Sequence, residues 1–130
     1  MPTLTVRDET TAGDSSAPIT LDFPTEQITV RELIRERIYQ EVQDYNRNKL
    51  GAFRGLIQPT DAEVALNGYK LKPGREINWK HQFEQACDAF KASRVLVLAG
   101  DRQTESLDEV ISLTRGVEVT FLKLVPLVGG

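Results

Sequence analysis

The order of strand and helix patterns along the chain predicts an α+β fold in which a mixed sheet packs on one side against a long helix. Two stretches of alternating apolar residues open the chain, one long amphipathic helical pattern follows, and two further strand patterns come near its end. Strands that precede and follow a long helix are typical of a domain in which that helix covers one face of the sheet.

The first two strand patterns lie at residues 4–6 and 19–23. In both, apolar and polar residues alternate with the period of two that is expected of a half-buried strand. The residues between them, 8–18, are mostly small and polar, which predicts a long hairpin loop.

A main helix is predicted over residues 30–48. Its apolar residues recur three or four positions apart and form one stripe, made up of Val30, Leu33, Ile34, Ile38, Val42 and Tyr45. Glu32 follows Thr29 by three residues, so the hydroxyl and the carboxylate can each bond the other's backbone amide in a capping box. The helix should therefore begin directly after Thr29.

The segment after this helix predicts a small hairpin and a second helix. Asn67-Gly68 suits the two central positions of a type I′ turn. The second helix should run from about Asn78, whose side chain can cap it, to Phe90. Its apolar stripe consists of Phe83, Ala86, Cys87 and Phe90.

Two further strands are predicted near the end of the chain. Residues 94–98 form a run rich in valine and leucine that ends in an Ala-Gly pair, which predicts a central strand followed by a turn. A short helical or turn segment should follow. The last strand is predicted over residues 116–125, and Pro126 ends it because proline has no amide to donate to a ladder.

Composition and charge predict one globular domain over residues 1–130. The chain is 40% hydrophobic and 27% charged, which supplies enough apolar material for a single core. Its 16 basic residues are interspersed among 19 acidic ones, as in Arg35-Glu36-Arg37, which predicts a solvated helix face and argues against nucleic-acid binding. We expect no membrane segment and a cytoplasmic protein, because no apolar run approaches 18 residues and the first residues lack a signal-peptide pattern.

The single cysteine and single histidine predict neither a metal site nor an enzyme. Cys87 has no partner for an internal disulfide and is expected to be a small buried residue, whereas His81 is expected on the surface. The two lie six residues apart on one helix and so on different faces, which excludes a local Cys-His pair. We therefore expect no catalytic residue, no metal and no bound cofactor.

The chain ends in Gly129-Gly130, shortly after a strongly apolar strand pattern. Two glycines end a chain by chance in roughly one sequence in two hundred. Glycine has no Cβ and gives the backbone the most freedom, so the pair suits a flexible tail, residues 126–130, that enters a narrow site. A truncation or a tag scar is the alternative.

Two stretches of the chain resemble ubiquitin and its relatives. Residues 19–38 (ITLDFPTEQITVRELIRERI) resemble ubiquitin's second strand, loop and capped main helix. Residues 94–130 resemble its final half, with a strand, an Ala-Gly turn, a Ser-Leu-Asp turn, a last strand and a Gly-Gly tail. The resemblance implies a β-grasp fold, with a mixed four- to five-stranded sheet on the main helix. Residues 49–92 have no counterpart in ubiquitin and would be an insertion that carries the hairpin and the second helix. Elaborated in this way, the chain looks like ubiquitin-like proteins of bacterial operons that also encode activating and conjugating enzymes.

The resemblance implies a protein modifier whose chemistry is carried by the α-carboxylate of Gly130. A carboxylate is a poor electrophile, so a partner activating enzyme would use ATP to form an acyl-adenylate and then a thioester. Gly129 would help the tail to thread a narrow channel. Pro126, Leu127 and Val128 would be read by a dedicated activating enzyme, because ubiquitin has an arginine in this part of its tail. The other implied partners of this monomeric chain are a conjugating enzyme, a metallo-isopeptidase and target proteins.

The resemblance also implies a partner-binding surface on the outer face of the sheet. Aligned on the Ala-Gly turn, Val97 takes the place of the centre of ubiquitin's hydrophobic patch. Alternation in the last strand then puts Phe121, Lys123 and Val125 outside as well. Counting back from Gly-Gly without a gap gives the opposite assignment, because a one-residue slip exchanges the two faces of a strand. We prefer the first assignment, since it exposes Lys123.

Two alternative functions stay open. A sulfur carrier, of the kind that serves thiamin or molybdopterin synthesis, would hold sulfur as a thiocarboxylate on the same C-terminal glycine, although such carriers are compact. In a non-covalent adaptor the glycines would have no chemistry, and Val97, Phe121 and the inserted segment would form a protein-binding face.

Overall fold

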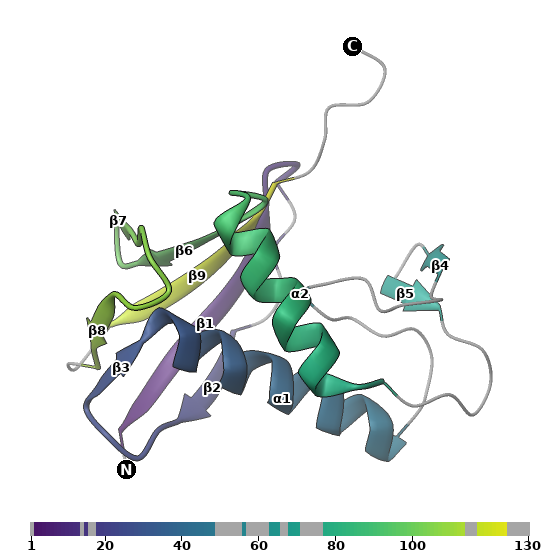
Figure 1. Cartoon of the computed structure of the whole chain (residues 1–130), viewed down its shortest axis with the longest axis horizontal. Coiled ribbons are helices and arrows are strands. Elements are labelled where there is room, and N and C mark those ends of the chain that lie inside the picture. The colour runs from purple at the N-terminus through teal and green to yellow at the C-terminus, as the bar shows by residue number, and fades with distance from the viewer. Residues whose placement is uncertain are drawn as a thin grey trace.

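A computed structural model of the chain describes residues 2–13, 15, 18–48, 56, 63–65, 68–70, 77–113 and 117–124. In these residues a five-stranded sheet lies against the long helix α1 (Val30–Asn48), as Figure 1 shows. A second helix, α2 (Trp79–Lys91), packs on α1 and on one strand of the sheet. The predicted α+β class, with a mixed sheet and two helices, is confirmed.

The main sheet has the first and last strands of the described chain side by side near its centre. Its order is β2 (Ile19–Asp22), β1 (Thr3–Thr10), β9 (Glu118–Lys123), β6 (Val95–Ala99) and β7 (Arg102–Gln103). Strands β1 and β9 run parallel, and the other neighbours are antiparallel. The sheet therefore joins two ends of the chain that are more than a hundred residues apart.

Strand β1 is longer than the sequence predicted. Its final residues, Asp8 to Thr10, pair with Phe121 to Lys123 of β9, whereas the sequence assigned Asp8 to a loop. The prediction was wrong here because it rested on the polarity of residues 8–10 alone. These residues are in a strand because they pair with β9, which lies at the other end of the sequence.

Helix α1 begins where its capping residues predicted. The Thr29 amide donates to Glu32 Oε1 at 3.2 Å, and the Glu32 amide donates to Thr29 Oγ1 at 3.1 Å, which confirms the capping box. The predicted apolar stripe faces the sheet, with exposed fractions of 1% or less for Val30, Leu33, Ile34, Ile38 and Val42. Burial of this stripe fixes the helix across one face of the sheet.

Helix α2 shares the same core. Asn78 Oδ1 accepts hydrogen bonds from the amides of Lys80 and His81, so the predicted cap is confirmed. The residues that α2 buries against the sheet and α1 include Ala86, Cys87, Ala89 and Phe90. Helix α2 thus contributes directly to the packing of the described elements.

Three short pairings complete the described strands. The hairpin predicted after α1 is present as β4 (Glu63–Ala65) and β5 (Gly68–Lys70), but Ala65 pairs with Gly68, so Gly68 begins the second strand instead of lying in the turn. Strand β3 (Gln27–Thr29) pairs with β8 (Val110–Ser112), directly before α1. The sequence predicted neither β3 and β8 nor the two-residue strand β7.

Neither helix in the described ranges is long and apolar enough to cross a lipid bilayer.

Candidate functional site

Four leucines form an outer leucine surface on the face of the sheet turned away from α1. They are Leu96 and Leu98 of β6, Leu122 of β9, and Leu124 just after it. Leu96 pairs with Leu122 across the two strands, and the Leu124 amide donates to the Arg94 carbonyl at 3.0 Å. Leu124 is 39% exposed and the other three leucines are half-buried. The surface thus lies at the end of β9, where the tail begins.

Three of the four residues that the sequence placed on this surface lie on the opposite face. Val97 and Phe121 pair with each other and are 0% exposed, so both belong to the core beneath α1. Lys123 pairs with Val95 and lies half-buried on that same core side. The preferred strand assignment was therefore wrong by one residue, and the opposite assignment, obtained by counting back from Gly-Gly, is confirmed.

The error has a simple physical cause. Alternation divides the side chains of a strand between two faces but does not say which face is buried. An error of one position therefore moves every side chain to the opposite face. Phe121 fills the core with a large apolar ring, whereas exposure of Lys123 was a weak criterion, because a long side chain can lie along apolar surface and keep its ammonium in water.

A charged pair borders the outer leucine surface. Arg7 of β1 lies opposite Thr120 of β9, and its Nε lies 3.2 Å from Glu118 Oε2. These two side chains are 43% and 53% exposed, so the ion pair contributes little to stability. An apolar centre beside a charged rim is the usual composition of a protein-binding surface.

Six residues with predicted roles lie outside the described part of the chain. They are Val125, predicted on the partner-binding surface, and the tail residues Pro126, Leu127, Val128, Gly129 and Gly130. Leu124 is the last described residue, and its amide donates to the Arg94 carbonyl.

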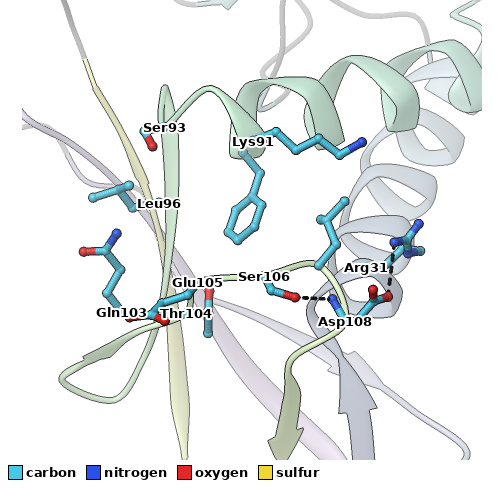
Figure 2. A pocket seen from close by; sticks show the side chains of 11 residues that line it. Arg31, Lys91, Ser93, Leu96, Gln103, Thr104, Glu105, Ser106 and Asp108 are labelled. Atoms are coloured by element: carbon cyan, nitrogen blue, oxygen red, sulfur yellow. Dashed lines mark hydrogen bonds and ion pairs between the residues drawn. The ribbon is translucent and has the colours of Figure 1, made fainter.

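A hollow of about 490 Å³ lies beside the outer leucine surface, between the end of α2, strand β6 and the loop 103–108. Figure 2 shows Leu96 and Gln103 on one side of it and Arg31 beside Asp108 on the other. Arg31 Nη2 lies 3.2 Å from Asp108 Oδ1, and both side chains are about half exposed or more. The hollow is therefore a solvated recess with polar walls that shares Leu96 with the outer leucine surface.

The loop that walls this recess is held by its own hydrogen bonds. Thr104 is 2% exposed, and both its amide and its hydroxyl donate to the Val97 carbonyl, at 3.0 and 2.8 Å. The Asp108 amide donates to Ser106 Oγ at 3.0 Å, and the Glu105 amide donates to Glu109 Oε1 at 2.9 Å. These bonds make residues 104–109 a turn, one of the two forms that the sequence predicted.

Cys87 and His81 take the places predicted for them. Cys87 is 9% exposed, and burial raises the pKa of its thiol, which keeps it protonated and unreactive. His81 is exposed in the first turn of α2. Within the ranges that the structure describes, no three His, Cys, Asp or Glu side chains are grouped so that they could hold a metal ion.

A buried ionic cluster was missed by the sequence reasoning, which assigned Arg37 to a solvated helix face. Arg37 is 4% exposed and forms ion pairs with Asp8 of β1 and with Glu41, one turn further along α1. The sequence did contain a usable signal. Arg37 lies three residues after Ile34, and Glu41 lies three after Ile38, so both continue the apolar stripe of the helix.

Comparison with protein-family models, with curated proteins and with solved structures found no match to this chain.

Proposed function

We propose that this chain is a ubiquitin-like protein modifier of β-grasp type, activated at the carboxyl group of Gly130 and conjugated to target proteins in a bacterial ubiquitination-like pathway. In this proposal the chain is a substrate and not an enzyme, and it binds no cofactor of its own. Its partners are an activating enzyme that uses ATP, a conjugating enzyme and an isopeptidase that removes the modifier.

The chemistry proceeds in three displacements on one acyl group. The Gly130 carboxylate attacks the α-phosphorus of ATP, and pyrophosphate leaves to give the acyl-adenylate. A cysteine thiolate of the partner then attacks the carbonyl carbon, and AMP leaves to give a thioester. Finally an amine of the target attacks the same carbon, the thiol leaves, and an amide bond forms. Each step keeps the acyl group reactive until it reaches the target.

The observation that carries the proposal is the arrangement of the main sheet. The strand order β2-β1-β9-β6-β7, with β1 and β9 parallel near its centre and α1 packed across one face, is compatible with a β-grasp fold. In this arrangement the central strand β9 leads directly into the tail. Residues 126–130 span at most about 17 Å when extended, enough to reach into a partner's active site.

The outer leucine surface supports the proposal as a docking site for the partner enzymes. It replaces Val97 and Phe121, which the core excludes from that role. Leu122 lies near the end of β9, and Leu124 directly follows that strand. An enzyme that binds these leucines is therefore positioned to receive Gly130. When an enzyme binds a surface that lies a fixed distance from the reacting group, it also positions that group in its own active site. The same surface can then serve several enzymes in turn.

The proposal is tested by following adducts of an N-terminally tagged chain in the cells that naturally make it. We expect one adduct that disappears with reductant, the thioester, and further adducts that survive reductant, the conjugates. Both should depend on ATP, and both should be absent when Gly129 and Gly130 are deleted. Leu122→Asp, which leaves the tail intact, should reduce both adducts by weakening docking.

Two other outcomes would replace the proposal. Intact chain that carries a sulfur atom in place of one carboxyl oxygen would identify a sulfur carrier. Full biological activity after deletion of both glycines, with no adduct in any condition, would identify a non-covalent adaptor.

A further inference from the structure

The buried ionic cluster joins helix α1 to strand β1. Arg37 of α1 pairs with Asp8 of β1 and with Glu41 of α1. The side chains of Arg37 and Glu41 are 5% and 8% exposed, and that of Asp8 is 29% exposed. Of these three residues only Asp8 lies outside α1, so its ion pair with Arg37 is the part of the cluster that connects the helix to the sheet.

The composition of this cluster is unfavourable for stability alone. Two carboxylates share one guanidinium in a place from which water is largely excluded. Within the described part of the chain, Asp8 Oδ1 and Arg37 Nε are buried without a hydrogen-bond partner. Because apolar side chains of similar volume often replace buried ion pairs without loss of stability, we looked for a role in positioning a segment of the chain.

Asp8 holds a part of β1 that the apolar core does not hold. Leu4 and Val6 are each 1% exposed and fix the first part of the strand through the core. Alternation places Asp8 next on the same face of β1, where its carboxylate contacts the buried Arg37. From Asp8 onward the strand is therefore tied to α1 by charge instead of apolar contact.

This part of β1 is the neighbour of the end of β9. Residues 8–10 pair with residues 121–123, and the Thr11 amide donates to the Lys123 carbonyl at 3.0 Å. On the other side of β9, the Leu124 amide donates to the Arg94 carbonyl at 3.0 Å. The end of β9 thus lies between a segment tied to α1 through Asp8 and the start of β6.

We propose that Arg37 is a positioning residue, which acts through Asp8 to hold the end of β9 in place, directly before the segment that carries Gly130. Contacts pass in order from Arg37 to Asp8, from β1 to residues 121–123, and from there to Leu124. The positioning of β9 stands on these contacts alone. Its consequence for the reaction at Gly130 rests on the proposed function.

Asp8→Ala removes this connection and leaves the rest of the cluster balanced. Burial raises the pKa of Glu41 to about 7 from an ordinary 4.5, and the charge of Asp8 adds to that rise. Without Asp8, Glu41 ionises more readily and supplies one counter-charge for Arg37. Glu41 also keeps the Leu56 amide, which donates to its two carboxylate oxygens at 3.1 and 3.2 Å. We therefore expect the variant to fold.

Amide hydrogen exchange of the full chain tests the positioning. In Asp8→Ala, exchange of the Thr11 and Leu124 amides should quicken on the order of ten-fold, the effect expected for loss of one contact to a charged group. The amides of Ile38 and Val97, which belong to residues of the core, report general loss of stability and should quicken less. This difference separates a local effect on β9 from overall destabilisation.

Glu118→Ala is the matched control, because it removes another ion pair that joins β1 to β9. The Glu118 carboxylate contacts Arg7 at the surface, near the start of β9. Its loss should leave exchange at Thr11 and Leu124 unchanged. An equal effect of the two variants at Leu124 would overturn the proposal.

Three results in Asp8→Ala would also overturn it: unchanged exchange at both amides, faster exchange at Thr11 alone, and equal acceleration at Ile38 and Val97. Should Asp8→Ala fail to fold, Asp8→Asn is measured in its place. This variant keeps an oxygen acceptor for Arg37, so a smaller acceleration confined to Thr11 and Leu124 is expected, and an unchanged Leu124 amide overturns the proposal.

The consequence for the reaction is measured separately, by the rate at which the tagged chain forms its thioester adduct. Asp8→Ala should slow this step on the order of ten-fold, because the reacting end starts from a less defined position. If the wild-type chain forms no adduct, the proposed function fails and the exchange experiment still decides the positioning. If exchange quickens as expected and the adduct forms at the wild-type rate, the positioning of β9 has no consequence for the reaction, and that part of the proposal is refuted.

Discussion

Neighbouring side chains on β9 have opposite roles, and substitutions at Phe121 and Leu122 should separate them. Phe121→Ala removes a fully buried ring and should lower the free energy of unfolding by about 3–5 kcal/mol. Leu122→Asp places its charge on the outer face and should cost far less stability while it weakens partner binding. Denaturant titration of both variants checks the first expectation. Equal losses of stability would contradict the assignment of the two faces.

The buried ionic cluster gives a second expectation at the residue scale. Arg37→Met leaves the Glu41 carboxylate buried without its cation and should lower the free energy of unfolding by about 3–5 kcal/mol. Arg37→Met combined with Glu41→Gln removes the charges of this pair and keeps an acceptor for the Leu56 amide, but it leaves Asp8 without its cation, so it should recover only part of that loss. Equilibrium unfolding of the single and double variants measures the coupling. A double variant no more stable than Arg37→Met would show that the charges are not coupled.

At the scale of elements, Asn46 fixes the start of α2 to α1. Asn46→Ala leaves the amide and carbonyl of buried Ile77 without partners and should cost about 1–3 kcal/mol. Hydrogen exchange should quicken in α2 while the β1 and β9 amides keep their order of protection. Gln43→Ala is the matched control on the same helix, since its bond to the Tyr39 hydroxyl lies at the surface and its loss should change stability by less than about 0.5 kcal/mol. Slowed or unchanged exchange in α2 would contradict this role.

Both helices could be predicted from the sequence because their determinants are local. The capping box of Thr29 and Glu32, the Asn78 cap and the two apolar stripes all lie within a few residues of the helices that they define. The missed strands β3, β7 and β8 have two or three residues each, too few to show alternation. Their pairing is decided by partners elsewhere in the chain.

The candidate site could be predicted only in part, because some of its features depend on residues that are far apart in the sequence. The presence of a last strand before Pro126 could be predicted from residues 116–126 alone. Which face of that strand is buried depends on its register with β6, in which Val97 pairs with Phe121. Alignment on the Ala-Gly turn was not sufficient to predict which of the two faces that is. Arg37 was assigned to solvent because its partner Asp8 lies on a strand whose extent the sequence did not reveal.

At the scale of the whole molecule, Glu41 should make stability depend on pH in an uncommon direction for an acid. Its pKa is raised on folding, from 4.5 to about 7, so the stability it contributes is complete below pH 4.5 and is lost as pH rises to 7. Over this range the wild-type chain should lose about 3 kcal/mol relative to Glu41→Gln. Denaturant midpoints of both proteins at several pH values check the difference. Parallel curves would contradict it.

The proposed modifier function depends on an acyl bond between Gly130 and another protein, and mass spectrometry of tryptic digests from the native cells tests it most directly. Trypsin cleaves after Lys123, so each conjugated lysine should retain residues 124–130 as a branch. We expect such branched peptides in cells that make the intact chain and none in cells that make the chain without Gly129 and Gly130. Recovery of only the unmodified C-terminal peptide, from cells in which the chain is abundant and active, would contradict the account.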